Sequence, residues 1–527
     1  MSALTGTRHL VWLVLRRDRV RLPLWVVGLT AITAVSARSV AGLYDTPVKV
    51  AGYGVTVEDS AASRLLNGTP YGVDTIAGIT AYEVTALSGA LVALMAIFLV
   101  VRHTRAEEES GAAELLRSTV LGRHAATAAA LLVAAAASLL VGLLDAAVLV
   151  ADDLPTSGSL LHGAAVAGVG LVFTAVAAVA AQVASSARGA LGLAIAVGAV
   201  LFVVRGVGAV RKDALVWLSP FGWQEGVRAY AGDRWWPLLL LLACTGVLLA
   251  LAGWLTAHRD FGAGLVQARS GRPRAGAWLG GPLGLAERVQ RAMTLGWAVG
   301  LFAVGCLFGA VGREVVTLVE SNPDIARVFG ARLDDVVRGY FAFVISFLGV
   351  IVSAYAVASA MRLPHEESQG RAEMALATGV SRTRWALAHV LVTTVGSLVV
   401  LTLVGLGMAG THALVSGDGS LFWPVLGGCL ATAPAVLLVA ATVVLLHGWR
   451  PRWVALAWAV FAFALLQSYL GDLLDLPDAV SSLSPFWHLS MLPVDDWDPV
   501  PALVVGVLAV LLAAVGLVGL RRRDLAS

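Results

Sequence analysis

The segment Glu107-Glu108-Glu109-Ser110-Gly111-Ala112-Ala113-Glu114 returns 259 residues later as Glu366-Glu367-Ser368-Gln369-Gly370-Arg371-Ala372-Glu373. Each copy has two adjacent glutamates, then a glycine, then a further glutamate at the same spacing. An arginine follows at the same distance in both, Arg123 in the first copy and Arg382 in the second. Because the pattern returns with its spacing kept, it indicates that the chain is an internal duplication.

Two further features repeat in the same order around this segment. The motif Leu218-Ser219-Pro220-Phe221 returns 265 residues later as Leu483-Ser484-Pro485-Phe486, and the apolar stretch 24–29 has a counterpart at 296–301. The spans of both copies would enter the membrane from the same side. The sequence therefore predicts parallel repeats, related by an axis along the membrane normal.

The composition is that of a protein surrounded by lipid. Of 527 residues, 58% are hydrophobic and 13% are charged, whereas soluble domains carry about 25% charged residues. The net charge of only +3 does not indicate a basic surface of the kind that binds nucleic acid. The three cysteines lie singly in apolar runs, so we expect neither a disulfide framework nor a metal centre.

Twelve apolar stretches meet or approach the roughly 20 residues that a membrane-spanning helix needs. We therefore predict an all-α integral membrane protein with twelve transmembrane helices in two fused six-helix repeats. A first six-span half is expected at 1–256, a cytoplasmic linker with an interfacial helix at 257–293, and a second half at 294–527. The expected spans are 22–42, 79–101, 126–150, 162–184, 190–210, 236–256, 294–312, 337–361, 386–410, 421–446, 452–471 and 500–520.

Arginine placement predicts the orientation. With twelve spans both termini share one side, and the loops assigned to that side hold most of the 37 basic residues. The positive-inside rule then places both termini in the cytoplasm and the chain in the plasma membrane. A cleavable signal peptide is the alternative for the N-terminus, but the apolar run after Arg21 is longer than a signal core. Residues 5–21 and 285–293 are expected to be interfacial helices.

The duplicated acidic segment lies between spans two and three of each copy. Glu107 and Glu114 are seven residues apart, which predicts that both project from one face of a short amphipathic helix. Such a surface suits docking to Arg or Lys of a cytoplasmic partner through charge-assisted hydrogen bonds. For one copy alone a solvated charge run is the simpler interpretation, and the repetition favours docking.

The repeated Ser-Pro-Phe motif precedes the last span of each copy on the outer side. Residues 217–232 and 481–497 are moderately apolar and broken by proline, which predicts a short re-entrant or surface-lying helix. Their tryptophans are typical of an aromatic belt at the membrane interface. A lid over a transport path is the sharper hypothesis, with Pro220, Phe221, Pro485 and Phe486 as candidate outer gate residues.

No catalytic motif is recognisable. A phosphate-binding loop needs Lys followed by Ser or Thr after a glycine-rich turn, and neither Lys49 nor Lys212 stands in that context. We therefore expect a transport subunit, not an enzyme, with no cofactor or metal of its own. Asp145 lies within a predicted span. It would be a proton relay or substrate contact if it faces the bundle, and a snorkelling carboxylate otherwise.

The order of these motifs resembles that of the ABC-2 type permeases of actinobacteria. More narrowly, the chain is similar to the fused twelve-span permeases of polyketide-antibiotic exporters, which include tetronasin-type resistance and mycobacterial multidrug efflux systems. The resemblance covers nearly the whole chain and implies a type V exporter-like fold. It also implies that the acidic segment is a coupling helix seated on a separately encoded ATPase. The implied coupling residues are Glu107, Glu108, Gly111, Glu114, Arg123, Glu366, Glu367, Gly370, Arg371 and Glu373.

The resemblance further implies that two copies of a cytoplasmic ATPase bind the chain, with ATP and Mg²⁺ held in that partner. The first copy has Ala112 where the second has Arg371, so the two docking surfaces are expected to bind with unequal strength. The cargo would be a hydrophobic or amphipathic, antibiotic-like or drug-like small molecule, exported along spans two and five of each copy. Candidate path residues are Thr85, Ser88, Phe202, Arg205, Tyr340, Ser346, Tyr355, Trp458, Phe461 and Gln467.

Two other classes of protein compete with this interpretation. A major-facilitator-type secondary transporter also has twelve spans in parallel halves and is driven by an ion gradient. Its loop between spans two and three is usually rich in Gly, Asp and Arg, whereas this one is rich in Glu. An integral-membrane enzyme for lipid-linked substrates would need an acid pair or a metal cluster, and the sequence offers neither.

Overall fold

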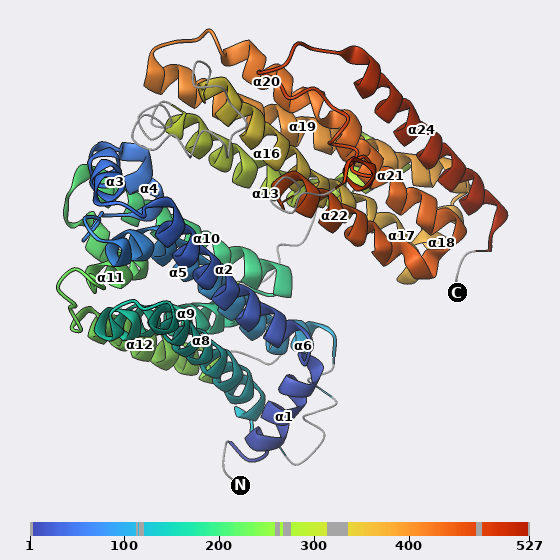
Figure 1. The fold of residues 1–527 in the computed structure, drawn as a ribbon. Helices are drawn as coiled ribbons and strands as arrows, with labels where there is room; N and C mark the ends of the chain where they lie inside the picture. The colour runs from blue at the N-terminus through green and yellow to red at the C-terminus, as the bar shows by residue number, and fades with distance from the viewer. Residues whose placement is uncertain are drawn as a thin grey trace. The chain divides into compact units, whose positions relative to one another are not determined.

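The computed structural model describes residues 4–111, 114, 121–258, 264–266, 274, 276–312, 336–470 and 477–524. Within these ranges the chain is helical, apart from turns and one isolated bridge between Ala184 and Val266. It divides into two compact units, Met1–Ser270 and Gly271–Ser527 (Figure 1). Most of the predicted linker at 257–293 before Gly276 lies outside the described residues.

Twelve helices in the described ranges are long and apolar enough to cross a membrane. The predicted fold class, an all-α membrane protein of two six-span repeats, is therefore confirmed. The first unit contributes α2 (Arg21–Leu43), α5 (Ile76–His103), α8 (Ala125–Ala151), α9 (Thr156–Val183), α10 (Ala187–Arg211) and α12 (Pro237–Ala257). The second contributes α13 (Pro282–Val311), α16 (Val336–Ala360), α19 (Arg382–Ser416), the consecutive pair α20 (Phe422–Ala431) and α21 (Ala433–Trp449), α22 (Ala457–Leu470) and α24 (Pro499–Arg522).

Short helices connect the spans. In the first unit they are α1 (Thr7–Arg17), α3 (Pro47–Asp59), α4 (Ala61–Asn67), α6 (Arg105–Glu109), the 3-10 helix η1 (Ala214–Leu218) and α11 (Pro220–Gly226). In the second they are η2 (Ala277–Gly280), α17 (Arg362–Ser368), α18 (Arg371–Leu376), η4 (Pro451–Leu456) and α23 (Asp478–Ser481).

The two predicted interfacial helices have different outcomes. The first is present as α1, which ends at Arg17 before α2 begins. The prediction of a separate helix at 285–293 is wrong, because α13 runs without interruption from Pro282 to Val311. No proline follows Pro282 in this stretch, so nothing breaks the helix between the interfacial and the apolar part.

Capping side chains and prolines set where several spans begin. Thr75 Oγ1 accepts a hydrogen bond from the backbone N–H of Gly78 at 3.0 Å at the start of α5. Ser381 Oγ accepts one from the N–H of Arg384 at 3.3 Å at the start of α19. Such acceptors satisfy N–H groups that have no partner within the helix. The helices α12, α13 and α24 each begin with proline, whose missing N–H costs nothing in the first turn.

Small residues bring α8 and α9 together in the first unit. A Cβ added at Gly142 of α8 would lie 2.2 Å from the carbonyl oxygen of Gly163 on α9. A Cβ at Gly170 of α9 would lie 2.5 Å from Ser138 Oγ. Close approach through small residues is how membrane helices gain packing energy without a hydrophobic driving force. The central helix α9 also contacts α5, α10 and α12.

The second unit uses glycine contacts between different helix pairs. A Cβ at Gly309 of α13 would lie 2.2 Å from the carbonyl oxygen of Met408 on α19. A Cβ at Gly448 of α21 would lie 2.0 Å from the carbonyl oxygen of Gly516 on α24. Figure 1 shows α24 running along α21. Although the sequence is duplicated, α19 packs mainly on α13, whereas its counterpart α8 packs mainly on α9.

Candidate functional site

The acidic segment of the first unit forms a bent elbow after span two. The helix α6 ends at Glu109, and Gly111 follows with φ +75°. This left-handed backbone conformation suits glycine and turns the chain out of the helix. The prediction that Glu107 and Glu114 share one face of a continuous helix is therefore wrong.

The second unit has an elbow of the same design. The helix α17 contains Glu366 and Glu367, Gly370 follows with φ +69°, and α18 then carries Arg371 and Glu373. Both elbows thus bend at the glycine of the repeated motif. The sequence signal for this bend was the glycine itself, since Gly at a helix end is typical of a left-handed C-terminal cap.

Paired glutamates in the first elbow are engaged within the chain. Glu107 Oε1 lies 2.7 Å from Arg17 Nη1 on α1. Glu108 Oε2 accepts a hydrogen bond of 2.7 Å from the buried Arg105. These bonds tie the elbow to neighbouring elements, so neither carboxylate is simply a solvated charge.

The second elbow shows the same use of its paired glutamates. Arg371 donates two hydrogen bonds to Glu366, of 2.8 and 2.9 Å, and these bonds raise the pKa of its guanidinium. Glu367 accepts two from Arg523, of 2.7 and 2.6 Å, and His447 Nε2 lies 3.0 Å from the same carboxylate. The end of α24 is thereby tied to α17.

The last glutamate of each motif is placed differently. Glu114 and Glu373 are exposed, and neither forms an ion pair with any described residue. Arg123 is exposed and donates to His124 Nε2 at 2.8 Å. Arg371, which is paired with Glu366, is exposed as well, so these four are the exposed charged side chains of the predicted coupling set.

The Ser-Pro-Phe motif begins a helix in the first unit. Ser219 Oγ accepts a hydrogen bond from the N–H of Phe221, and α11 follows with Pro220 at its first turn. Both Pro220 and Phe221 are buried, and the ring of Phe221 packs 5.2 Å from Phe173 and 5.5 Å from Phe202. The predicted short helix is confirmed in this copy.

In the second unit the same motif lies in turns. Pro485 and Phe486 are buried, but the described chain has no helix between Ser481 and Pro499. The prediction of a helix in this copy is therefore wrong. Position 490 is a serine where the first copy has Glu225, and the ion pair described next has no equivalent here.

A buried ion pair fixes α11 in the first unit. Arg205 of α10 is fully buried and donates to Glu225 Oε1 at 2.6 Å and to the carbonyl oxygen of Leu66 at 2.7 Å. Gly68 has φ +97°, and a Cβ there would lie 2.0 Å from Glu225 Oε1. Arg205 is a predicted path residue, and its guanidinium joins α10, α11 and α4. Glu225 was missed, although an acid four residues after the repeated motif was a visible signal.

The remaining path candidates of the first unit lie close to this ion pair. The backbone carbonyl of Thr85 accepts a hydrogen bond of 3.0 Å from Gln224 of α11, and Ser88 is buried one turn further along α5. Phe202 stacks under the guanidinium of Arg205, 4.2 Å from its ring centroid to Cζ. Thr85, His162, Gln224 and Glu225 line a small cavity of about 30 Å³.

The path candidates of the second unit divide between two helices. On α16, Tyr340 and Tyr355 are buried with their hydroxyls bonded to Phe308 O and Thr294 Oγ1, both at 2.9 Å, and Ser346 is half-buried. On α22, Trp458 is exposed, whereas Phe461 and Gln467 are half-buried. Both tyrosine hydroxyls are therefore bonded within this unit.

Asp145 is fully buried on α8, with Thr30 and Thr33 of α2 beside it. It does not snorkel to the interface. Within the described residues, no group of three or more His, Cys, Asp or Glu is placed to bind a metal ion.

Comparison with known proteins gives two matches. Residues 279–521 match the family model described as "Multidrug efflux system permease Rv1217c, C-terminal domain". The chain is also 38% identical over 528 residues to the multidrug efflux system permease protein Rv1217c of Mycobacterium tuberculosis strain ATCC 25618 / H37Rv, covering 99% of this chain and 96% of the relative.

Proposed function

The chain belongs to the family of the multidrug efflux permease Rv1217c, and we propose that it is the permease subunit of an ATP-driven exporter whose ATPase is a separate polypeptide. The cargo is a hydrophobic or amphipathic small molecule of antibiotic or drug type, carried out of the cell. Both termini and both elbows lie on the cytoplasmic side of the plasma membrane. The relative's description as a multidrug efflux permease supports the cargo class.

The shared design of the two elbows carries this proposal. Each has a left-handed glycine between a pair of bonded glutamates and one exposed glutamate. The exposed residues, Glu114 and Glu373, offer a carboxylate to Arg or Lys of a partner. The bonded glutamates connect each elbow to its own unit, through Arg17 in the first and Arg523 in the second. A force applied at the exposed residue therefore reaches helices of the same unit.

Two copies of the ATPase dock in this proposal, one at each elbow, and bind ATP and Mg²⁺ themselves. Their closure would tilt the six-span halves, 1–256 and 294–527, against each other. Moving a two-state equilibrium from 99:1 to 1:99 takes about 5.5 kcal/mol of differential binding. The two elbows bind with unequal strength, because the second carries Arg371 paired with Glu366 and the first has Ala112 at this position.

Charge reversal on the exposed glutamates tests the docking role. The chain is coexpressed with an ABC ATPase from the same genome, and copurification and vanadate-sensitive ATP hydrolysis are measured. We expect Glu114→Arg with Glu373→Arg to abolish copurification, since each change places like charges at the contact. The matched control reverses two exposed carboxylates elsewhere, Asp74→Arg with Asp496→Arg, and keeps the complex. Unchanged association of the first variant removes these residues from docking.

The ion-driven alternative is tested on the purified chain in liposomes without ATPase. Export needs nucleotide under the proposal, so no cargo should move on a proton or sodium gradient alone. Gradient-driven movement by the chain alone would assign it to the secondary transporters.

A further inference from the structure

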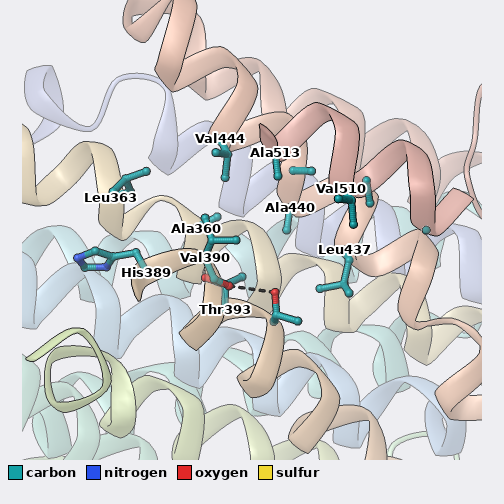
Figure 2. Close-up of a pocket in the computed structure, with 14 residues that line it drawn as sticks. Ala360, Leu363, His389, Val390, Thr393, Leu437, Ala440, Val444, Val510 and Ala513 are labelled. Carbon is teal, nitrogen blue, oxygen red and sulfur yellow. Dashed lines mark hydrogen bonds between the residues drawn. The ribbon is translucent and has the colours of Figure 1, made fainter. Parts of the chain in front are cut away.

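An apolar groove lies inside the second unit, between α19 on one side and α21 and α24 on the other. Its volume is about 170 Å³, and fourteen residues line it. Figure 2 shows Val390 and Thr393 of α19 facing the side chains that α21 and α24 contribute, among them Ala440 and Val510. The end of α16 and the start of α17 close one side through Ala360 and Leu363.

Polar bonds hold α19 on the far side of this groove. Gln290 of α13 donates to His389 Nδ1 of α19 at 3.3 Å and accepts from Ser359 of α16 at 2.5 Å. The hydroxyls of Ser359 and Thr393 lie 2.8 Å apart. This closed network draws α19 toward α13 and α16, and the glycine contact between Gly309 and α19 supports the same position.

The first unit lacks the groove residues that make this network. At the offset of 259 residues, His389 and Thr393 correspond to Ala130 and Ala134, which are both buried. Alanine has no polar side-chain atom, so it cannot form side-chain hydrogen bonds with α2 or α5. Small side chains on α8 also allow a close approach to α9, which is seen at Gly142. The polar network that holds α19 is therefore a feature of the second unit.

The chemistry of the lining selects an apolar occupant. Its polar side chains already have partners: His389 and Thr393 belong to the network, and Thr394 donates to the carbonyl oxygen of Val390 at 3.0 Å. Among the polar side-chain atoms of the described lining residues, only His389 Nε2 has no hydrogen-bond partner. Water and polar ligands need two or more such atoms to be held in a cavity. A hydrocarbon chain needs none.

The position of the groove selects the source of that hydrocarbon. It follows the middle of α21 from Leu437 to Val444 and the middle of α24 from Gly506 to Ala513. Side chains at its rim, such as Val510, are exposed on the face of a membrane-spanning helix. The medium at this depth is the acyl region of the bilayer, so lipid chains reach the groove at very high local concentration.

We propose that this groove binds one acyl chain of a membrane phospholipid, inserted between α19 and the α21–α24 pair. The chain fills space that the polar network keeps open and so replaces, in the second unit, the helix contact that α8 and α9 make in the first. A groove left empty would lose these van der Waals contacts. The proposal goes beyond the exporter function and is independent of the ATPase.

The test uses the purified full chain in nanodiscs of phosphatidylcholine with a photoactivatable diazirine on one acyl chain. Labelled peptides are mapped by mass spectrometry. We expect labelling at Val390, Val444 and Val510, which face one another across the groove, above that of exposed lipid-facing valines elsewhere on α24.

Two filling variants and two matched controls make the test specific. Gly506→Leu adds a side chain at the groove, and its Cβ meets no close atom, because the nearest is Pro434 Cβ at 3.8 Å. Its control is Gly300→Leu on α13, where no atom lies within 4 Å. Ala513→Leu fills the groove from α24, and Ala514→Leu adds the same bulk at the next, exposed position. Labelling of the groove should be lost in the filling variants and kept in the controls.

Two results would overturn the proposal. Groove labelling that survives both filling variants would show that the lipid lies elsewhere. Displacement of the label by a transported drug, at concentrations that leave other lipid-facing labelling unchanged, would assign the groove to cargo. Because no readout depends on nucleotide or on the ATPase, either result leaves the exporter proposal to be judged on its own experiment.

Discussion

Arg523, the residue that follows α24, holds the carboxylate of Glu367 with two hydrogen bonds of 2.7 and 2.6 Å. Its own backbone carbonyl accepts a third bond, of 2.7 Å, from Arg382 at the start of α19. Three segments that are distant in sequence, the elbow helix α17, the start of α19 and the end of α24, therefore meet at Arg523. Glu367 is a fixed part of the elbow, because its side chain is 5% exposed.

We expect Arg523→Ala to destabilise the second unit. The variant removes both hydrogen bonds that Arg523 donates to the buried Glu367 carboxylate, and removing one partner of a buried ion pair costs about 3–5 kcal/mol. Partial solvation of Arg523 places the expected loss near the lower end of this range. The apparent melting temperature in detergent measures it. Arg522→Ala, which removes an exposed neighbour, should change stability by no more than about 0.5 kcal/mol, and equal effects would contradict the prediction.

The bend of the second elbow depends on Gly370. An alanine at this φ of +69° would lose about 1–2 kcal/mol of conformational stability. Because no atom lies within 4 Å of the added Cβ, no steric clash adds to this loss. We expect Gly370→Ala to weaken ATPase copurification and Gly370→Asn to weaken it less, because Asn tolerates this conformation better. Gly192→Ala is the control, since Gly192 lies in a helix with equally open surroundings. A loss of binding in that control as well would refute the conformational argument.

The ion pair between Arg205 and Glu225 predicts strong coupling between two substitutions. Arg205→Met should cost about 3–5 kcal/mol, because it leaves Glu225 as an uncompensated buried charge. Adding Glu225→Gln removes that charge, and we expect it to restore more than half of the loss. A double-mutant cycle on the apparent melting temperature measures the coupling. Additive effects would mean that the two side chains act independently.

The number and positions of the spans were predictable because each depends on a strong local signal. The duplication was predictable because several motifs return in the same order. An apolar stretch of sufficient length must be helical in lipid, whatever surrounds it. The glycines of the two elbows also indicate a bend, whereas the seven-residue spacing of Glu107 and Glu114 predicts a continuous helix that the chain does not form. The contacts of the predicted path residues could not be predicted for a different reason. Arg205 and Tyr355 look polar and available in a sequence, and their partners, Glu225 and Thr294, are distant in it.

The packing between helices could not be predicted from the sequence either, because the residues that bond to one another are distant in the chain. The order of the motifs predicts six spans per copy. It does not indicate that His389 and Thr393 form hydrogen bonds with residues of α13 and α16. The span that carries this network packs mainly on α13, whereas its counterpart, with alanine at both positions, packs mainly on α9. Duplicated sequence therefore predicted duplicated topology correctly and the helix contacts only in part.

The close contact between α8 and α9 predicts that a leucine is not tolerated at Gly142, whereas it is tolerated at a glycine with open surroundings on another helix. Gly142→Leu should prevent folding of the first unit, because even a Cβ would lie 2.2 Å from the Gly163 carbonyl oxygen and backbone cannot move aside as a flexible side chain can. Gly410→Leu on α19, where no atom lies within 4 Å, should fold as the parent does. Yield of monodisperse protein by size-exclusion chromatography is the readout. Normal yield of Gly142→Leu would show that this contact is loose.

A substitution at Asp145 distinguishes ion-driven transport from transport that is coupled to an ATPase through the elbows. An ion-driven transporter needs a carboxylate that gains and loses a cation, and Asp145 is a fully buried carboxylate inside a span. Coupling through the elbows needs no such exchange, so Asp145→Asn, which keeps the shape beside Thr30 and Thr33, should leave nucleotide-driven efflux near the parent level. Efflux of a fluorescent cargo from cells expressing permease and ATPase measures this. Asp145→Leu serves as the control for packing, since it removes both carboxylate oxygens. Loss of efflux in Asp145→Asn, with normal folding and ATPase binding, would mean that this carboxylate takes part in transport itself.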